Sequence, residues 1–242
     1  NMIKDKVFLP DRDSIDPFVF DESVATVFPD MLRRSIPGYD ASIRAISHLT
    51  KKCIRPSTLF YDLGCSLGAA TLAMRHNIVA KNSKIIAVDN SKSMTSRCME
   101  IVSKDNSDIP IQVITGDIRE LNIKNASMII LNYTLQFVPI IDRSSMIKKI
   151  YKGMLSGGLF FLSEKIIYED KKIDNLLNEM HYNFKRNNSY SDIEIKKKQI
   201  ALESVLIPEY ISTHKKRLHM AGFEHVAIYL KHLNFISFLA IK

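Results

Sequence analysis

Short aliphatic and aromatic runs recur along the chain, separated by more polar stretches with helical spacing. Four runs are nearly continuous in Val, Ile, Leu, Phe and Tyr, as strands buried on both faces of a parallel sheet are. They lie at residues 58–63, 84–90, 111–117 and 127–135. Segments with helical spacing follow the first two runs, at residues 69–78 and 91–105. This order predicts a parallel sheet wound by right-handed crossovers.

The pattern continues with a helix over residues 143–154, a turn at 155–158 and a strand over 159–166. Residues 212–222 predict a further helix, after which two strand candidates close the chain at residues 225–233 and 235–242. Because these two strands are so close in sequence, we expect them to pair in antiparallel fashion on the parallel sheet.

Two segments stand outside this alternation. Residues 2–55 form a proline-marked lead, in which Asp21 or Ser23 can cap a short helix and the later part again has helical spacing. Residues 168–210 also have helical spacing and predict a helical insertion. We expect residues 1–242 to form a single domain that contains both segments.

Composition narrows the class of protein. Of the 242 residues, 46% are hydrophobic and 25% are charged, which suits one compact α/β domain. There is no run of eighteen uncharged apolar residues, and the charged N-terminal stretch is unlike a signal peptide, so we expect a cytoplasmic protein without membrane contact. The three cysteines lack CxxC spacing and the histidines have no acidic or cysteine cluster beside them, so no metal is expected.

The formal net charge of +8 is compatible with an anionic partner. Positive potential attracts RNA and anionic metabolites. The lysines are scattered, however, without the basic stripe interleaved with aromatic residues that single-stranded nucleic acids use. The lysines are better explained as solvent-exposed residues spread over the surface, and a functional basic patch is the alternative.

The first four strand candidates each end at residues suited to binding a small molecule, where open α/β sheets bind their ligands. Gly64 and Gly68 follow the first strand, allow close approach to the backbone, and lead into a helix N-terminus that attracts a carboxylate. Asp89 follows the second strand, where an acid can accept both hydroxyls of a ribose. Asp117 follows the third strand, in position for an adenine amino group, and Asn132 follows the fourth.

The loop DLGCSLG, residues 62–68, differs from the loop that binds dinucleotides. Ser66 stands where the pyrophosphate needs the closest backbone approach, so we expect a nucleoside with an amino-acid tail in place of NAD. Cys65 invites an interpretation as a nucleophile. Because no histidine is adjacent in sequence and the loop needs a small residue there, covalent catalysis is the weaker interpretation.

Longer stretches carry a closer resemblance. FDESVATVFPDMLRRSIPGYD, YDLGCSLGAATLAMRHNI, GGLFFLSEK, MHYNFKR and THKKRLHMAGFEH are similar to the carboxy-S-adenosyl-L-methionine synthase family. The similarity extends from about Asp5 to the C-terminus, and the VFPDM lead and DLGCSLGAAT are its most specific motifs. It implies a Rossmann-like class I methyltransferase fold, with a mostly parallel seven-stranded sheet, an antiparallel C-terminal strand and the helical insertion.

The resemblance also implies an activity. The family converts S-adenosyl-L-methionine and prephenate to carboxy-S-adenosyl-L-methionine and phenylpyruvate, with no metal. A tRNA carboxymethyltransferase then uses the product to modify the wobble uridine of tRNA, so contact with that enzyme is expected and direct nucleic-acid binding is not required. A homodimer is also implied, and the apolar residues left over in the helical insertion make that segment the expected interface.

The family's ligand positions, carried over one by one, fall on Tyr39, Gly64, Cys65, Ser66, Asp89, Asn90, Asp117, Ile118 and Asn132. The family also uses an arginine of the insertion to hold the added carboxylate, and alignment puts Gln199 at that position. A glutamine amide donates hydrogen bonds but lacks the charge and the fork of arginine. Gln199 is therefore a predicted binding residue that departs from the family, and Lys197 or Lys198 is the candidate to take over its role.

The implied mechanism assigns no general base. Prephenate yields carbon dioxide and hydroxide as its ring becomes aromatic, so the protein has to orient the reactants and exclude water. Two alternatives remain at this point. One is an S-adenosylmethionine-dependent methyltransferase acting on tRNA, and the other is a non-catalytic adapter that binds S-adenosylmethionine, which the glutamine at position 199 keeps open.

Overall fold

The computed structural model describes residues 3–9 and 15–242, so residues 2 and 10–14 of the expected lead lie outside the described part. The strands are β1 (Leu59–Leu63), β2 (Lys84–Asp89), β3 (Ile111–Thr115), β4 (Ala126–Asn132), β5 (Met154–Ile167), β6 (Glu209–Tyr210), β7 (His225–His232) and β8 (Phe235–Ile241). The helices are α1 (Glu22–Ser35), α2 (Tyr39–Thr50), α3 (Ala69–Arg75), α4 (Lys92–Ser103), the short 3-10 helix η1 (Leu135–Phe137), α5 (Ile140–Gly153), α6 (Lys171–Asn187), α7 (Asp192–Glu203) and α8 (Ile211–Ala221).

One sheet organises the chain, with the strand order β3-β2-β1-β4-β5-β8-β7 and β6 paired beside β5. The strands from β3 to β5 are parallel, whereas β8 runs antiparallel to both β5 and β7. The predicted parallel sheet with an antiparallel end is confirmed. Strand order reverses at β1, where Leu63 pairs with Val88 of β2 and Asp62 with Ile130 of β4. The loops after β1 and β4 diverge at this reversal, which leaves room for a ligand.

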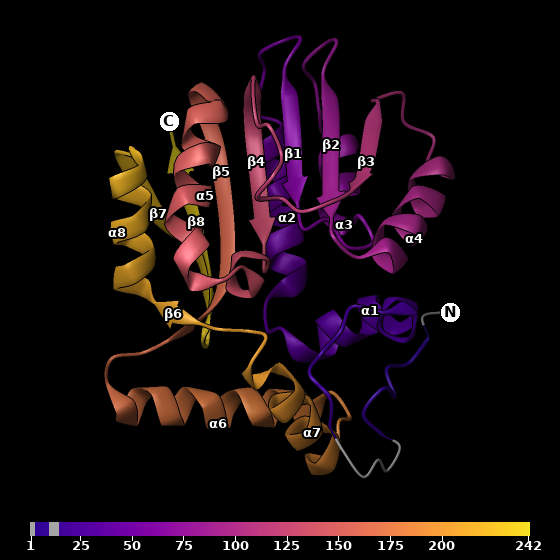
Figure 1. The fold of residues 1–242 in the computed structure, drawn as a ribbon, viewed down its shortest axis with the longest axis vertical. Helices are drawn as coiled ribbons and strands as arrows, with labels where there is room; N and C mark the ends of the chain where they lie inside the picture. Colours follow the sequence, from indigo (N-terminus) through magenta and orange to yellow (C-terminus); the bar gives the residue numbers. More distant parts are fainter. Residues whose placement is uncertain (1–2, 10–14) are drawn as a thin grey trace.

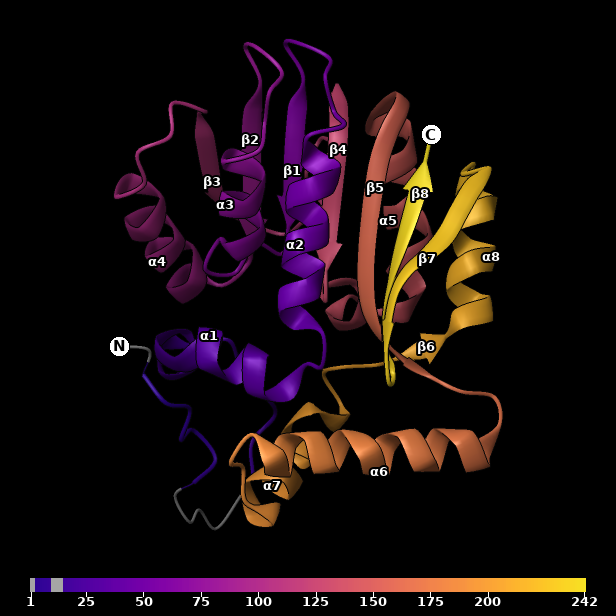
Figure 2. The same cartoon turned by 180° about the vertical axis from the view of Figure 1, so that it is seen from behind.

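Helices cover both faces of the sheet, with α2 and α3 on one side and α5 and α8 on the other (Figures 1 and 2). Ile46 of α2 and Met74 of α3 pack in one apolar cluster with Phe60 of β1. Ile147 of α5 and Leu218 of α8 belong to the cluster on the opposite face. Both faces are therefore buried, as the nearly continuous apolar strands predicted. In residues 3–9 and 15–242, no helix is both long enough and apolar enough to cross a bilayer.

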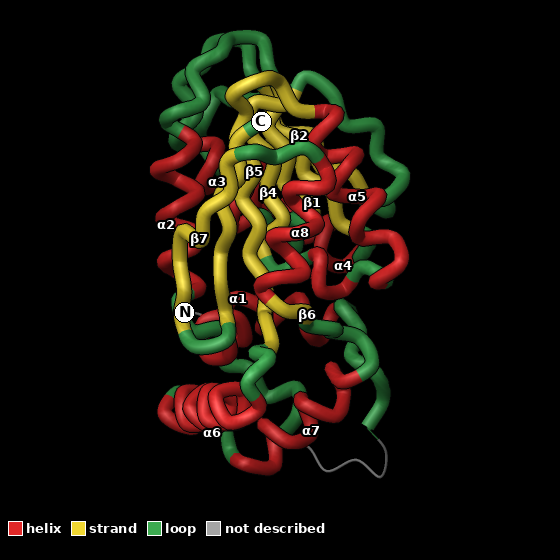
Figure 3. Tube along the Cα trace, turned by 90° about the vertical axis from the view of Figure 1, so that its left-hand side faces the viewer, coloured by secondary structure: helices red, strands yellow, loops and turns green. Residues whose placement is uncertain are grey.

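A further layer, made of α1, α6 and α7, lies beyond the carboxyl ends of the parallel strands (Figures 1 and 3). The helix predicted in the lead is α1, and the Asp21 side chain accepts the Val24 N–H at its first turn. In the predicted insertion, Asp170 caps α6, while Ser191 and Glu194 form a capping box at the start of α7. This layer forms the floor beneath the strand ends.

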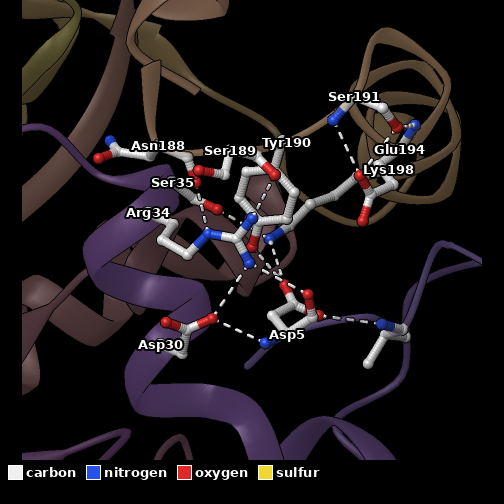
Figure 4. A network of polar contacts seen from close by, with 11 residues as sticks. Asp5, Asp30, Arg34, Ser35, Asn188, Ser189, Tyr190, Ser191, Glu194 and Lys198 are labelled. Atoms are coloured by element: carbon white, nitrogen blue, oxygen red, sulfur yellow. Dashed lines mark hydrogen bonds and ion pairs between the residues drawn. The ribbon is translucent and has the colours of Figure 1, made fainter. Parts of the chain in front are cut away.

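A buried polar network joins the lead to the insertion (Figure 4). The Arg34 guanidinium donates from Nε to the Asn188 carbonyl at 2.6 Å and from Nη2 to the Ser189 carbonyl at 2.8 Å. Its Cζ also lies 3.8 Å from the ring centroid of Tyr190, whose hydroxyl donates to Asp5. Because Arg34 belongs to α1 and its partners lie in the loop between α6 and α7, the network holds α1 and the α6–α7 segment together.

Two local details differ from the expectation. The turn expected at residues 155–158 is an irregular part of β5, which begins at Met154 and pairs again with β4 from Leu159 onward. Gly157 has a φ of +77° there, which permits the irregularity. The other detail is β6, whose two residues are too few for a periodic pattern to reveal.

Candidate active site

A cavity of about 300 Å³ opens between the carboxyl ends of the parallel strands and the α1–α6–α7 layer. Nine of the ten predicted binding residues line it: Tyr39, Gly64, Cys65, Ser66, Asp89, Asn90, Asp117, Ile118 and Asn132. The tenth, Gln199, does not. The strand-end reasoning therefore locates the cavity, whereas the roles of these residues toward a ligand stay predictions.

The loop after β1 is shaped by a glycine whose conformation and surroundings disfavour a side chain. Gly64 has a φ of +83°, and a Cβ built on it would lie 2.2 Å from the Thr134 hydroxyl oxygen. Ser66 is also left-handed, with a φ of 47°, and its N–H donates to Asp89 Oδ2 at 2.9 Å. The loop and the acid after β2 are thus locked together. Between them, Cys65 is buried, and the neighbouring Cys98 thiol together with burial raises the pKa of Cys65, which keeps the thiol protonated.

Three carboxylates line the cavity near the strand ends. Asp62 is fully buried and accepts a hydrogen bond from the Thr71 hydroxyl at 2.6 Å, and burial raises the pKa of Asp62 to about 6. Burial also raises the pKa of Asp89, although the N–H groups of Ser91 and Ser66 act in the opposite direction. Asp62 was not among the predicted binding residues, although it lies near the carboxyl end of β1, just before the predicted Gly64 loop.

Asp117 differs from the other two acids because it is already paired. Arg119 Nη2 donates to Asp117 Oδ2 at 2.6 Å, and Arg119 holds the pKa of that carboxyl below its usual range. The same guanidinium donates to Asp142 Oδ2 at 2.6 Å. The structure therefore commits much of the Asp117 carboxylate to Arg119, and the adenine contact expected for it stays a prediction.

Asn132, at the end of β4, is suited to forming a hydrogen bond with a polar group of a nucleoside. Its Oδ1 is buried without a hydrogen-bond partner in the described part of the chain. An unpaired buried oxygen costs free energy, so a hydrogen-bond donor on a ligand would stabilise this position. The residue lines the cavity beside Asp62 and the Gly64 loop, which together suit the ammonium and carboxylate of an amino-acid tail.

Aromatic side chains form much of the remaining wall, and sequence reasoning missed them. Phe20 from the lead packs edge to face against Phe137 at 5.2 Å and Phe28 at 6.0 Å between ring centroids. On another part of the wall Tyr133 lies 6.0 Å from Phe235, also edge to face. Phe20 and Phe28 belong to the lead, and only the fold brings them to the strand ends.

Gln199 lies outside the cavity of its own chain, and its binding role stays a prediction. Gln199 is exposed on α7 and does not line its own chain's cavity, whereas the preceding Lys198 is buried and does. Consecutive residues of a helix point about 100° apart, so the side chain next to the expected position faces the cavity instead. Of the two lysines considered as replacements, Lys198 is the one that lines it.

Within residues 3–9 and 15–242, no three His, Cys, Asp or Glu side chains gather as ligands of an ion. His181 lines the cavity, and its Nε2 donates to the Ser35 carbonyl at 2.7 Å, because a carbonyl oxygen can only accept. His181 is thus held as a neutral ring, because burial and the nearby Lys185, Lys165 and Lys198 lower the pKa of His181 to about 2.

Comparison with known proteins identifies the family. The family model of the methyltransferase domain matches residues 60–158. The carboxy-S-adenosyl-L-methionine synthases of Shewanella baltica (strain OS155 / ATCC BAA-1091) and Shewanella oneidensis are each 47% identical over 242 residues, covering 100% of both chains. The chain belongs to the carboxy-S-adenosyl-L-methionine synthase family. It is an S-adenosyl-L-methionine-dependent enzyme of the transferase class.

A solved structure supports the fold assignment of this carboxy-S-adenosyl-L-methionine synthase family member. Human N-acetylserotonin methyltransferase, solved in complex with SAM, superposes with a TM-score of 0.61 at 17% identity, over 91% of this chain and 55% of that chain. At this identity the likeness shows the fold alone. The expected class I methyltransferase fold is confirmed.

Proposed function

We propose that the protein converts S-adenosyl-L-methionine and prephenate to carboxy-S-adenosyl-L-methionine, phenylpyruvate and water, acting in the cytoplasm. The product would supply the carboxymethyl group for modification of the tRNA wobble uridine by a partner enzyme. The observation that carries this proposal is the full-length 47% identity to carboxy-S-adenosyl-L-methionine synthases. The polar groups around the cavity at the strand reversal support it.

The reaction balances without a side chain as base. Prephenate loses carbon dioxide and hydroxide as its ring becomes aromatic, the hydroxide takes a proton from the sulfonium methyl, and the methyl carbon bonds to the carbon dioxide. The protein's part is then to hold the reactants in line and to keep bulk water out. Asp89 would hold the ribose hydroxyls, the Gly64 loop would approach the methionine tail, and the aromatic wall of Phe20 and Phe137 would exclude water.

The test is to incubate purified protein with S-adenosyl-L-methionine and prephenate and to look by mass spectrometry for the carboxylated nucleoside and phenylpyruvate. We expect both in equal amounts, and neither when prephenate is omitted. Methyl transfer to bulk tRNA without prephenate would instead favour a methyltransferase. Binding of S-adenosyl-L-methionine with no turnover would favour the non-catalytic adapter. Extraction of ligand from the protein as purified provides a second, independent readout.

We also propose that two copies of the chain associate through α6 and α7. Large apolar side chains are exposed on both helices: Ile173, Leu176, Met180, Ile193 and Ile200. Exposed apolar groups gathered in this way are typical of an interface. Association through α7 would also bring the exposed Gln199 of one copy close to the second copy.

Light scattering is expected to give a dimer of the 27.7 kDa chain, and Leu176→Asp is expected to give a monomer at micromolar concentration. Ile141→Asp is the matched control, because Ile141 is even more exposed but lies on α5. A monomeric wild type, or a dimer that survives Leu176→Asp, would rule out this interface.

A further inference from the structure

Three lysines line one end of the cavity, the buried Lys185 and Lys198 and the half-buried Lys165, and nothing in the proposed binding of S-adenosyl-L-methionine uses them. Lys165 comes from the end of β5, Lys185 from the last turn of α6 and Lys198 from α7. The acids of the site come from β1, β2 and the loop after β3 instead. The cavity is therefore polarised, with carboxylates from the sheet and ammonium groups from the end of β5 and the insertion.

The lysines differ in what neutralises them. Lys198 donates to the Ser35 hydroxyl at 2.9 Å and lies 3.8 Å from Asp5 Oδ2 (Figure 4). In residues 3–9 and 15–242, neither Lys165 nor Lys185 makes an ion pair with a carboxylate at 4.0 Å or less. The charge of Asp174 acts on Lys165, although the oxygens of Asp174 accept from Tyr168 and Asn178.

Burying ammonium groups together without a counterion is costly. Burial, with the charges of Lys198 and Lys165, lowers the pKa of Lys185 to about 7. Burial lowers the pKa of Lys165 as well, and it lowers the pKa of Lys198 to about 8 despite Asp5. An anion bound among the three lysines would favour their charged forms. The cluster is therefore better suited to binding an anionic ligand than to remaining without one.

The lysine end also has an apolar side. His181 lies edge to face on Phe235 at 4.9 Å between ring centroids, and Phe235 packs in turn on Tyr133. Tyr39 adds a third ring, 6.5 Å from Tyr133. A ligand here therefore meets ammonium groups on one side and aromatic rings on the other, which matches a ring-bearing dicarboxylate.

We propose that Lys165, Lys185 and Lys198 form the binding site for the dicarboxylate co-substrate of the reaction. Lys165 and Lys185 bind its carboxylates directly, while Lys198, tied to Ser35 and Asp5, fixes the far side of the site. The identity of the dicarboxylate as prephenate rests on the proposed function, whereas the anion site rests on the lysines themselves. Lys198 in this position also supplies a positive charge that Gln199 lacks.

The test measures dicarboxylate binding without turnover. Protein saturated with S-adenosylhomocysteine, which has no methyl group to react, is titrated by calorimetry with prephenate and, in parallel, with the inert dicarboxylate phenylsuccinate. Lys165→Met and Lys185→Met are each expected to weaken dicarboxylate binding at least tenfold, since each removes a charged hydrogen bond. Lys185→Arg keeps the charge and is expected to retain most of the affinity. Lys172→Met, on the exposed part of α6, is the matched control and is expected to bind like wild type.

S-adenosylhomocysteine binding is measured for every variant and is expected to stay within about twofold of wild type, which shows that each variant is folded. The proposal is overturned if wild type binds neither dicarboxylate, or if the lysine variants bind as tightly as wild type. The proposed function fails separately, if wild type makes no carboxylated product. Lysine-dependent binding of phenylsuccinate would then still support the anion site.

Discussion

Replacing Asp89 by alanine is expected to weaken S-adenosyl-L-methionine binding about a hundredfold. The carboxylate accepts the N–H of Ser66 on Oδ2 and the N–H of Ser91 on Oδ1, both at 2.9 Å, so it fixes the glycine loop as well as offering acceptors to the ribose. Two charge-assisted hydrogen bonds to a nucleoside are together worth about 3 kcal/mol or more, which corresponds to this change in Kd. Calorimetric titration of wild type and variant measures it directly.

A matched control separates this effect from a general loss of charge. Asp108→Ala removes an exposed carboxylate in the loop before β3 and is expected to leave the affinity unchanged. Asp89→Asn keeps the shape of the side chain, but its amide group faces one of the two N–H donors and cannot accept from it, so an intermediate loss is expected. An affinity of Asp89→Ala within threefold of wild type would show that the ribose is held elsewhere.

The largest stability loss is expected from Arg143→Met, which should lower the free energy of unfolding by about 3–5 kcal/mol. Arg143 is fully buried and donates to Glu209 Oε2 at 2.7 Å, to the Val138 carbonyl at 2.9 Å and to the Gln136 carbonyl at 3.0 Å. Removing the cation leaves Glu209 with Arg217 alone and leaves the buried Glu164 without the positive charge that favours its ionised form most. Urea unfolding measures the loss, and the melting temperature should fall by roughly 10 °C.

Arg97→Met provides the comparison for Arg143. Arg97 pairs with Glu22 at the surface, and an exposed ion pair contributes less than about 1 kcal/mol. If both variants lost the same stability, burial of the Arg143 network would not be what matters. Because Val138 and Gln136 also line the cavity, Arg143→Met is further expected to weaken ligand binding in the fraction that remains folded.

Much of the site was predictable because it depends on local signals. Asp89 and Asn132 each lie at the carboxyl end of a strand with a clear apolar pattern, and a parallel sheet brings such ends together. The same holds for the Gly64 loop, where glycine marks a backbone conformation that other residues avoid. For these residues, identifying the strand from the apolar pattern was sufficient to place them at the cavity.

The basic end of the cavity was not predictable in this way. Lys165 and Lys185 are twenty residues apart in sequence and meet only because the α6–α7 segment folds back beneath the sheet. Nothing in a run of scattered lysines distinguishes a buried one from a solvated one. Gln199 is a separate case, since the motif identifies the helix but the residue is exposed and lies outside its own chain's cavity.

The network around Arg34 has a consequence for how the chain is made. Arg34 leaves the ribosome early, but the carbonyl that its Nη2 binds belongs to Ser189, 155 residues later. At a synthesis rate of about 5–20 residues per second, that partner follows after roughly 10 to 30 s. During this interval Arg34 lacks its carbonyl partners Asn188 and Ser189, and α1 lacks Ala201 of α7 to pack against. The floor of the cavity is therefore completed late in translation, and the apolar side of α1 that packs on α7 stays uncovered until then.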